Sequence, residues 1–214
     1  SSANLLAIQC LINPYRKTKL KEGDEVLIPA LCWSTSLWPI VQSGLKPIFV
    51  DINTLDLNID LDDLEKKITK KTKAIMLVHV LSNSTDMERL LKLKKKYNLI
   101  IIEDTCESLG SKYKNKYLGT FGDFSTFSFY YSHQITSGEG GMVCCKERSD
   151  YEIMKSLRSH GWSRGLINEK RISTTFRKLD SKFIFYNSGF NLRPTDITAA
   201  IGSNQFKRLD KFSS

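Results

Sequence analysis

Short apolar runs alternate along this chain with segments that have helical periodicity. Residues 73–80 (KAIMLVHV) and 99–102 (LIII) are almost continuously apolar, as in strands buried on both faces. Between them, residues 85–97 carry apolar side chains at positions 87, 90, 91 and 93, the spacing of an inward-facing helix stripe. This alternation predicts an α/β fold in which helices cover both faces of a mostly parallel sheet.

The same criteria predict the remaining elements. Further strands are expected at 25–28, at 46–52 and on both sides of the turn around His133, and helices at 34–44, 61–68 and 149–158. One helix opens the chain and another starts at 193–196, whereas residues 162–183 have little periodicity and are predicted to form a long loop. Because the first residues already look like a helix inside a fold, we expect a fragment cut at both ends.

Composition narrows the class of protein. The 214 residues carry a formal net charge of +9, largely from lysine clusters at 66–73 and 92–96, but no nucleic-acid-binding motif accompanies them. No apolar run is long enough to cross a membrane. The five cysteines are scattered, without a CxxC or HExxH pattern, so neither a disulfide framework nor a metal site is expected. We therefore expect a cytoplasmic protein without nucleic-acid or membrane partners.

The turn within residues 125–142 (STFSFYYSHQITSGEGGM) is the strongest candidate for a functional site. Its glycine run, GEGG, allows the main chain to approach a ligand closely. His133 lies at its centre, where an imidazole can take up and return a proton near neutral pH. Glu103 and Asp104 directly follow the LIII run, at the sheet edge where open α/β folds place their ligands.

Several ordered segments now need one explanation, namely SSANL, GDEVLIPA, PIFVD, EDTCES, GTFGDFSTFSF, GEGG and GFNLRPTDITAAIG. Together they resemble the sugar aminotransferase family, the fold-type I enzymes that use pyridoxal phosphate on nucleotide-linked keto sugars. The resemblance implies a three-layer α/β/α large domain with a mostly parallel mixed sheet. Residues 1–214 are then expected to be a partial coenzyme-binding large domain, without its N-terminal segment and its smaller C-terminal domain.

The resemblance also assigns coenzyme contacts. Asp104 is expected to pair with the protonated pyridine nitrogen, which keeps the ring an electron sink. Trp33 is expected to stack on the ring, and Asn191 to reach the phosphate held by a neighbouring subunit, which implies a homodimer with shared sites. The hydroxyl and backbone donors expected to hold the phosphate belong to Ser1, Ser2 and Ser128.

His133 marks a departure from the aminotransferases, which carry at this position the lysine that bonds covalently to the coenzyme. No lysine lies between Lys116 and Lys146. With Glu107 in place of the usual glutamine, this resembles the small branch of 3-dehydratases that act on nucleotide-linked 4-keto-6-deoxyhexoses from the pyridoxamine phosphate form. His133 is therefore the expected catalytic base for loss of the C3 hydroxyl, and Glu107 is expected to contact the coenzyme or to tune His133.

The resemblance carries finer expectations as well. Branch members with an iron–sulfur cluster have cysteines after the His133 loop, and residues 158–214 contain none. A cluster-free lyase of deoxysugar and lipopolysaccharide O-antigen biosynthesis is thus expected, recharged by L-glutamate and acting on GDP-4-keto-6-deoxymannose. His160 is a candidate for substrate binding or for capping a helix. Two alternatives stay open: a sugar aminotransferase whose lysine has been replaced, and a catalytically silent relative that binds nucleotide sugar.

Overall fold

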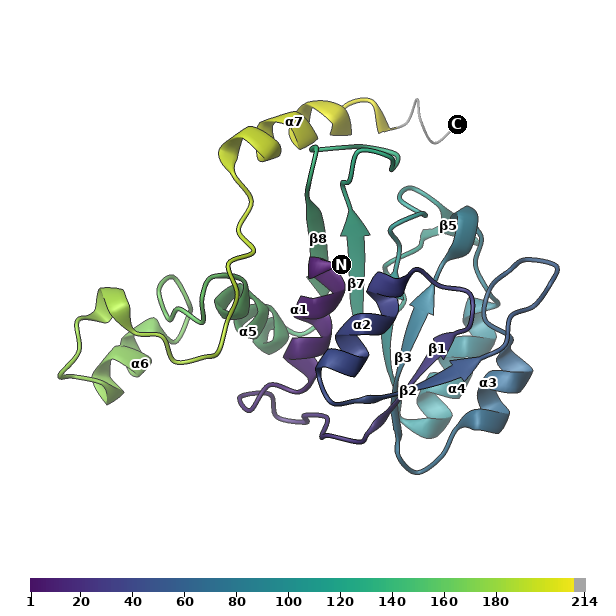
Figure 1. Ribbon diagram of the computed structural model, residues 1–214, viewed down its shortest axis with the longest axis horizontal. Coiled ribbons are helices and arrows are strands. Elements are labelled where there is room, and N and C mark those ends of the chain that lie inside the picture. The colour runs from purple at the N-terminus through teal and green to yellow at the C-terminus, as the bar shows by residue number, and fades with distance from the viewer. Residues whose placement is uncertain (210–214) are drawn as a thin grey trace.

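Figure 1 shows the computed structural model, which describes residues 1–209. Its centre is a six-stranded sheet with the strand order β2-β1-β3-β4-β7-β8. Only the pair β7 and β8 is antiparallel, so the predicted mostly parallel mixed sheet is confirmed. Its strands are β1 (Glu25–Pro29), β2 (Lys46–Val50), β3 (Thr72–Val78), β4 (Ile100–Asp104), β7 (Phe124–Ser128) and β8 (Gly141–Cys145), and a separate hairpin pairs β5 (Lys112–Tyr113) with β6 (Lys116–Tyr117).

Helices cover both faces of the large sheet. One face packs against α1 (Ser2–Leu11), α2 (Ser34–Gln42) and α5 (Arg148–Arg158), and the other against α3 (Leu61–Lys67) and α4 (Met87–Tyr97). Side chains of successive strand residues alternate between these layers, so Ile102 of β4 belongs to the first core and Ile101 to the second. The expected three-layer α/β/α arrangement is confirmed, and it explains why the buried strands are continuously apolar.

Capping side chains fix the ends of the helices in the second layer. Asp60 accepts hydrogen bonds from two first-turn amides of α3, and Asp86 does the same for α4. Asn98 closes α4 in a left-handed conformation (φ 52°, ψ 49°). Helix α4 begins at Met87 and not at residue 85, because the carboxylate of Asp86 satisfies its free amides.

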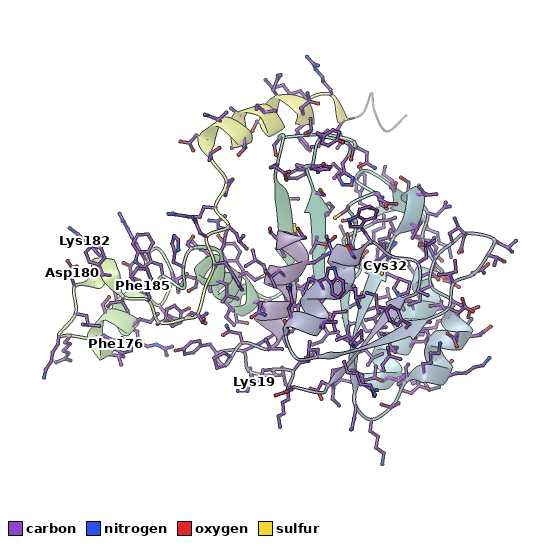
Figure 2. The ribbon with its side chains drawn as sticks, viewed as in Figure 1. Lys19, Cys32, Phe176, Asp180, Lys182 and Phe185 are labelled. Atoms are coloured by element: carbon purple, nitrogen blue, oxygen red, sulfur yellow. The ribbon has the colours of Figure 1, made fainter. Side chains whose placement is uncertain are left out.

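The last third of the chain corrects one prediction. Residues 162–183 are not a long loop, since they contain the helix α6 (Glu169–Thr175) and the 3-10 turn η2 (Ser181–Phe183). None of the residues of α6 is buried, so the helix has no apolar stripe by which to recognise it. Figure 2 shows this segment projecting from the sheet, with Phe176 labelled on it and Phe185 just after its end. Helix α7 (Asp196–Phe206), capped by Thr195, follows and lies over the turn between β7 and β8 (Figure 1).

Candidate active site

The carboxylate of Asp104 is the centre of a polar network at the carboxyl end of β4. Its Oδ2 accepts hydrogen bonds from Asn4 Nδ2 (2.8 Å) and Ser36 Oγ (2.7 Å), and its Oδ1 accepts one from the Cys106 backbone N–H (3.2 Å). Asn4, Ser36 and Asp104 are all buried. Three donors from three segments therefore fix the orientation of this carboxylate in a surrounding of low polarity.

Asn4 was missed in the sequence, although a signal for it exists. Positions 4, 7, 8 and 11 of α1 are buried and form one stripe at helical spacing, in which Asn4 is the polar member. A buried amide needs partners, and Asn4 also accepts a bond from Thr126 Oγ1 at 2.6 Å. Ser36 and Thr126 give no comparable signal, because hydroxyl side chains are ordinary in helix starts and strands.

The three predicted phosphate-binding serines lie at the same edge of the sheet. Ser1 is the N-cap of α1, and its side chain makes no capping bond there. Ser128 ends β7 opposite Gly141 of β8, and α1 begins with Ser2 beside these two strands (Figure 1). A Cβ added to Gly141 would lie 2.8 Å from a β7 carbonyl oxygen and 3.9 Å from Ala3 Cβ, so glycine permits this close approach.

Trp33 stands beside the Asp104 network. It is the N-cap residue of α2, and its carbonyl accepts the backbone N–H of Ser36 (2.9 Å), the residue that contacts Asp104. Trp33 is 74% exposed. Core packing of the indole is therefore excluded, and the ring is available to stack on a planar ligand.

His133 lies in a surface hollow of about 650 Å³ beyond the end of β7. Its backbone N–H donates to the Tyr130 carbonyl (3.1 Å), and the two rings meet edge-on with centroids 6.3 Å apart. The residue is partly exposed, so its imidazole is accessible from the hollow. The walls come from segments that follow β3, β4 and β7 and from α7, and they include Leu81, Ser82, Glu107, His133, Gln134 and Gln205.

Glu107 joins the wall of this hollow to the turn after β3. Its Oε2 accepts the Leu81 backbone N–H (3.0 Å), and its main-chain oxygen accepts Ser82 Oγ (2.9 Å) and Gln134 Nε2 (2.7 Å). Leu81 and Ser82 have left-handed φ values of 50° and 67°. Such a conformation costs about 1–2 kcal/mol for each non-glycine residue, so the bonds to Glu107 hold a strained turn in place. Gln134 is another residue that the sequence analysis missed.

Glu103 faces the opposite side of the sheet from Asp104. Its buried carboxylate accepts three backbone N–H bonds from residues 119–122 and pairs with His79 Nε2 (3.0 Å). Burial is the largest influence on the pKa of Glu103 and raises it, but the bonds to His79 and the backbone outweigh burial and hold the pKa below its ordinary value. Glu103 therefore organises the turn before β7 and does not line the hollow, and its partner His79 is fully buried.

His160 and Asn191 lie beyond the end of α5. Arg193 donates to His160 Nε2 at 3.2 Å. Because a guanidinium only donates, the His160 ring nitrogen is the acceptor in this pair. Asn191 is exposed and forms an isolated β-bridge with Ser159. Neither His160 nor Asn191 lines the hollow of its own chain.

No helix within residues 1–209 is long and apolar enough to cross a lipid bilayer. The same residues bring together no group of three or more His, Cys, Asp or Glu side chains able to hold a metal ion.

The sheet order, the three layers and the residues at the carboxyl ends of β4 and β7 define a fold-type I large domain of the kind found in pyridoxal-phosphate-dependent transferases. The chain belongs to the DegT/DnrJ/EryC1/StrS aminotransferase family, whose family model matches residues 2–214.

Two curated relatives and one solved structure are especially similar. GDP-4-keto-6-deoxy-D-mannose 3-dehydratase of Escherichia coli O55:H7 (strain CB9615 / EPEC) is 39% identical over 216 residues, which cover 100% of this chain and 55% of the relative. The enzyme of the same name from Yersinia pseudotuberculosis is 42% identical over 214 residues, which cover 99% and 54%. A crystal structure of GDP-4-keto-6-deoxymannose-3-dehydratase with a trapped PLP-glutamate geminal diamine superimposes with a TM-score of 0.90 at 38% identity, covering 98% of this chain and 55% of that one. The chain thus spans about half the length of the curated relatives it matches.

Proposed function

We propose that this chain belongs to a 3-dehydratase that removes the C3 hydroxyl of a nucleotide-linked 4-keto-6-deoxyhexose with a pyridoxamine or pyridoxal phosphate coenzyme. The proposal rests on the position of His133 in the hollow beyond β7. No lysine lies between Lys116 and Lys146, the stretch that contains its turn. A lysine there would capture the coenzyme covalently and favour amine transfer. A histidine leaves the coenzyme amine free and supplies a base.

The residues around Asp104 fit this coenzyme. An ionised carboxylate offers about four acceptor positions. Oδ2 already receives two donors and Oδ1 one, so Oδ1 retains a position for a protonated ring nitrogen. Trp33 offers an uncovered aromatic face for stacking. The first turn of α1 offers free backbone amides to the phosphate. The hydroxyls suited to the phosphate belong to Ser1, Ser2 and Ser128.

When bound, the coenzyme supplies an amine for the sugar ketone and an electron sink for the resulting carbanion. Asp104 would hold the ring nitrogen protonated, which would maintain that sink. His133 would take a proton from the carbon next to the coenzyme amine and would return a proton to the departing C3 oxygen, which would leave as water. Glu107 accepts three hydrogen bonds that hold the wall of the hollow in place. Glu107 and His133 both line this hollow.

The names of the relatives support the finer parts of the proposal. GDP-4-keto-6-deoxymannose is the proposed substrate and L-glutamate the proposed amino donor, which is converted to 2-oxoglutarate while ammonia is released. We further propose a homodimer in which the exposed Asn191 completes the phosphate site of the neighbouring subunit and His160 contributes to sugar binding. Residues 1–214 are taken as part of the coenzyme-binding large domain, with a cytoplasmic location and without an iron–sulfur cluster.

The test is to incubate the full-length protein with coenzyme, L-glutamate and GDP-4-keto-6-deoxymannose and to analyse the sugar by mass spectrometry. The expected product has lost one oxygen atom and retained its ketone, with one 2-oxoglutarate and one ammonia formed per sugar. No product is expected when glutamate is omitted and the coenzyme starts as pyridoxal phosphate. A sugar that has gained an amine would identify an aminotransferase and overturn the proposal. A protein that neither binds coenzyme nor turns over would be the silent relative.

A further inference from the structure

We infer that Gln134 and Ser82 are positioning residues for His133, because both donate to the main-chain oxygen of Glu107 and together lock the histidine-bearing turn against the wall of the hollow. The kinetic part of this inference rests on the proposed function. Its structural part does not, since it concerns only how three segments of the folded chain are held together.

The main-chain oxygen of Glu107 is the point where these segments meet. It accepts Gln134 Nε2 at 2.7 Å and Ser82 Oγ at 2.9 Å. A carbonyl oxygen has two lone pairs, so these donors use its full capacity. The three residues follow β3, β4 and β7, which are neighbours in the sheet, so one oxygen connects the ends of three adjacent strands.

The turn after β3 shows why this junction must be firm. Leu81 and Ser82 are consecutive non-glycine residues in the left-handed region, with φ values of 50° and 67°. The carboxylate of Glu107 holds the Leu81 N–H at 3.0 Å, while the Glu107 main chain holds the Ser82 hydroxyl. Such conformations persist where surrounding contacts over-determine them, and they gather at ligand sites. Both residues line the hollow that contains His133.

The junction acts on His133 through its neighbour in the chain. The His133 backbone is bonded within its own turn, to the Tyr130 carbonyl. Beyond it, Ile135 is buried and the Ser137 N–H bonds to the Phe129 carbonyl, which anchors the far side of the turn. The Gln134 side chain, directly after His133, connects the turn to Glu107 in the segment that follows β4. Loss of this bond therefore frees the imidazole to shift relative to the coenzyme edge, with little change to the residues expected to bind the coenzyme.

Three variants test the junction in the full-length protein. Gln134→Glu removes the donor while preserving side-chain length, and Ser82→Ala removes the hydroxyl while keeping the strained conformation. Ser82→Gly removes the hydroxyl and relieves the strain. The matched controls are Gln9→Glu and Thr174→Ala, which delete similar bonds, from Gln9 to Ser43 and from Thr174 to the Lys170 carbonyl, away from the hollow.

The first readout is amide hydrogen exchange of the coenzyme-free protein, which needs no activity. Exchange in peptides covering 129–136 is expected to be several-fold faster in Gln134→Glu and in both Ser82 variants, and unchanged in the controls. Unchanged exchange in all three variants would overturn the inference. So would faster exchange in Ser82→Ala with normal exchange in Ser82→Gly, because backbone strain and not the hydroxyl would then be responsible.

The second readout is the kinetics of dehydration. In Gln134→Glu, kcat is expected to fall roughly tenfold to a hundredfold, the scale expected for a misplaced reacting group, while KM for the sugar changes less than kcat. A rise in KM with unchanged kcat would contradict a positioning role. A wild-type protein without dehydratase activity would reject the proposed function alone, and hydrogen exchange would still decide whether the junction holds the turn.

Discussion

Asn4 donates its side-chain amide to Asp104 Oδ2 at 2.8 Å, although 100 positions separate the two residues in the chain. The same amide group accepts the Thr126 hydroxyl at 2.6 Å through its oxygen. One asparagine in the first turn of α1 thus connects the central strand β4 with β7. Because Asp104 is the proposed partner of the coenzyme ring, this contact couples the stability of the fold to the geometry of the site.

Replacing Asn4 with alanine should therefore affect both properties. The change leaves a buried carboxylate with one donor fewer and a buried hydroxyl without its acceptor, which should lower the unfolding free energy by about 1–3 kcal/mol. Urea denaturation measures this loss, and titration with pyridoxal phosphate should show weaker binding. Thr126→Val removes only the hydroxyl and should have a smaller effect on coenzyme affinity. Equal coenzyme affinity of wild type and Asn4→Ala would contradict the coupling.

The buried pair of Glu103 and His79 predicts a pH dependence of stability. The pKa of Glu103 in the folded protein lies below its ordinary value of 4.5, so its ionised form stabilises the fold above about pH 4.5. This contribution is lost as the pH falls from 4.5 through the folded-state pKa.

Glu103→Gln should therefore be destabilised by about 3–5 kcal/mol at pH 7, because the amide cannot accept all of the bonds that the carboxylate receives. The gap between this variant and wild type should narrow in urea titrations below pH 4.5. Glu22→Gln, at an exposed position, should stay within about 0.5 kcal/mol of wild type. A gap that is constant from pH 7 to pH 3.5 would show that the charge of Glu103 is not responsible.

Two glycines with similar backbone angles separate strain from crowding. Gly23 and Gly161 have φ values of 80° and 82°, but a Cβ on Gly23 would meet nothing within 4 Å, whereas one on Gly161 would lie 1.6 Å from the Asn187 carbonyl oxygen. Gly23→Ala should lose only about 1–2 kcal/mol of unfolding free energy. Gly161→Ala must in addition displace the segment after η2, and should have a clearly lower thermal midpoint. Similar midpoints for the two variants would refute this difference in packing.

His133 offers the most direct test of the proposed chemistry. His133→Asn retains a polar side chain of similar size without a proton acceptor, so kcat for dehydration should fall by about 10²–10⁴ while coenzyme binding persists. His133→Lys should instead capture pyridoxal phosphate covalently, which a shift of its absorbance band reports, and should direct some turnover to an amino sugar. Dehydration at the wild-type rate in His133→Asn would remove His133 from the mechanism.

The centre of the sheet was predictable because strands β1, β3 and β4 are buried on both faces and are marked by apolar sequence, as residues 73–80 and 99–102 illustrate. The helix α6 was not, because none of its residues is buried and its sequence therefore lacks periodicity. The hairpin of β5 and β6 was overlooked for a similar reason, as each strand has only two residues.

At the site, the sequence indicated Asp104, which follows a strong strand pattern, and His133, which lies between two such patterns. In the structure Asp104 ends β4 and His133 lies beyond the end of β7. The sequence did not reveal Ser36, Thr126 or Gln134. Their roles depend on contacts with residues far away in the chain, such as Ser36 with Asp104, and these follow from the packing of layers and not from local patterns. Glu103 and Asp104 look alike in sequence, and only strand alternation separates their roles.

The network of Asn4, Ser36, Asp104 and Thr126 also has a consequence for biosynthesis. Its members come from α1, α2, β4 and β7, so the network cannot close until the ribosome has released the chain at least as far as β7. Contacts that form before β7 is released are made without a complete network, and we expect the long separations in sequence between its members to slow folding. Because Asp104 is the proposed partner of the coenzyme ring, we expect the coenzyme site to be complete only after this network has closed.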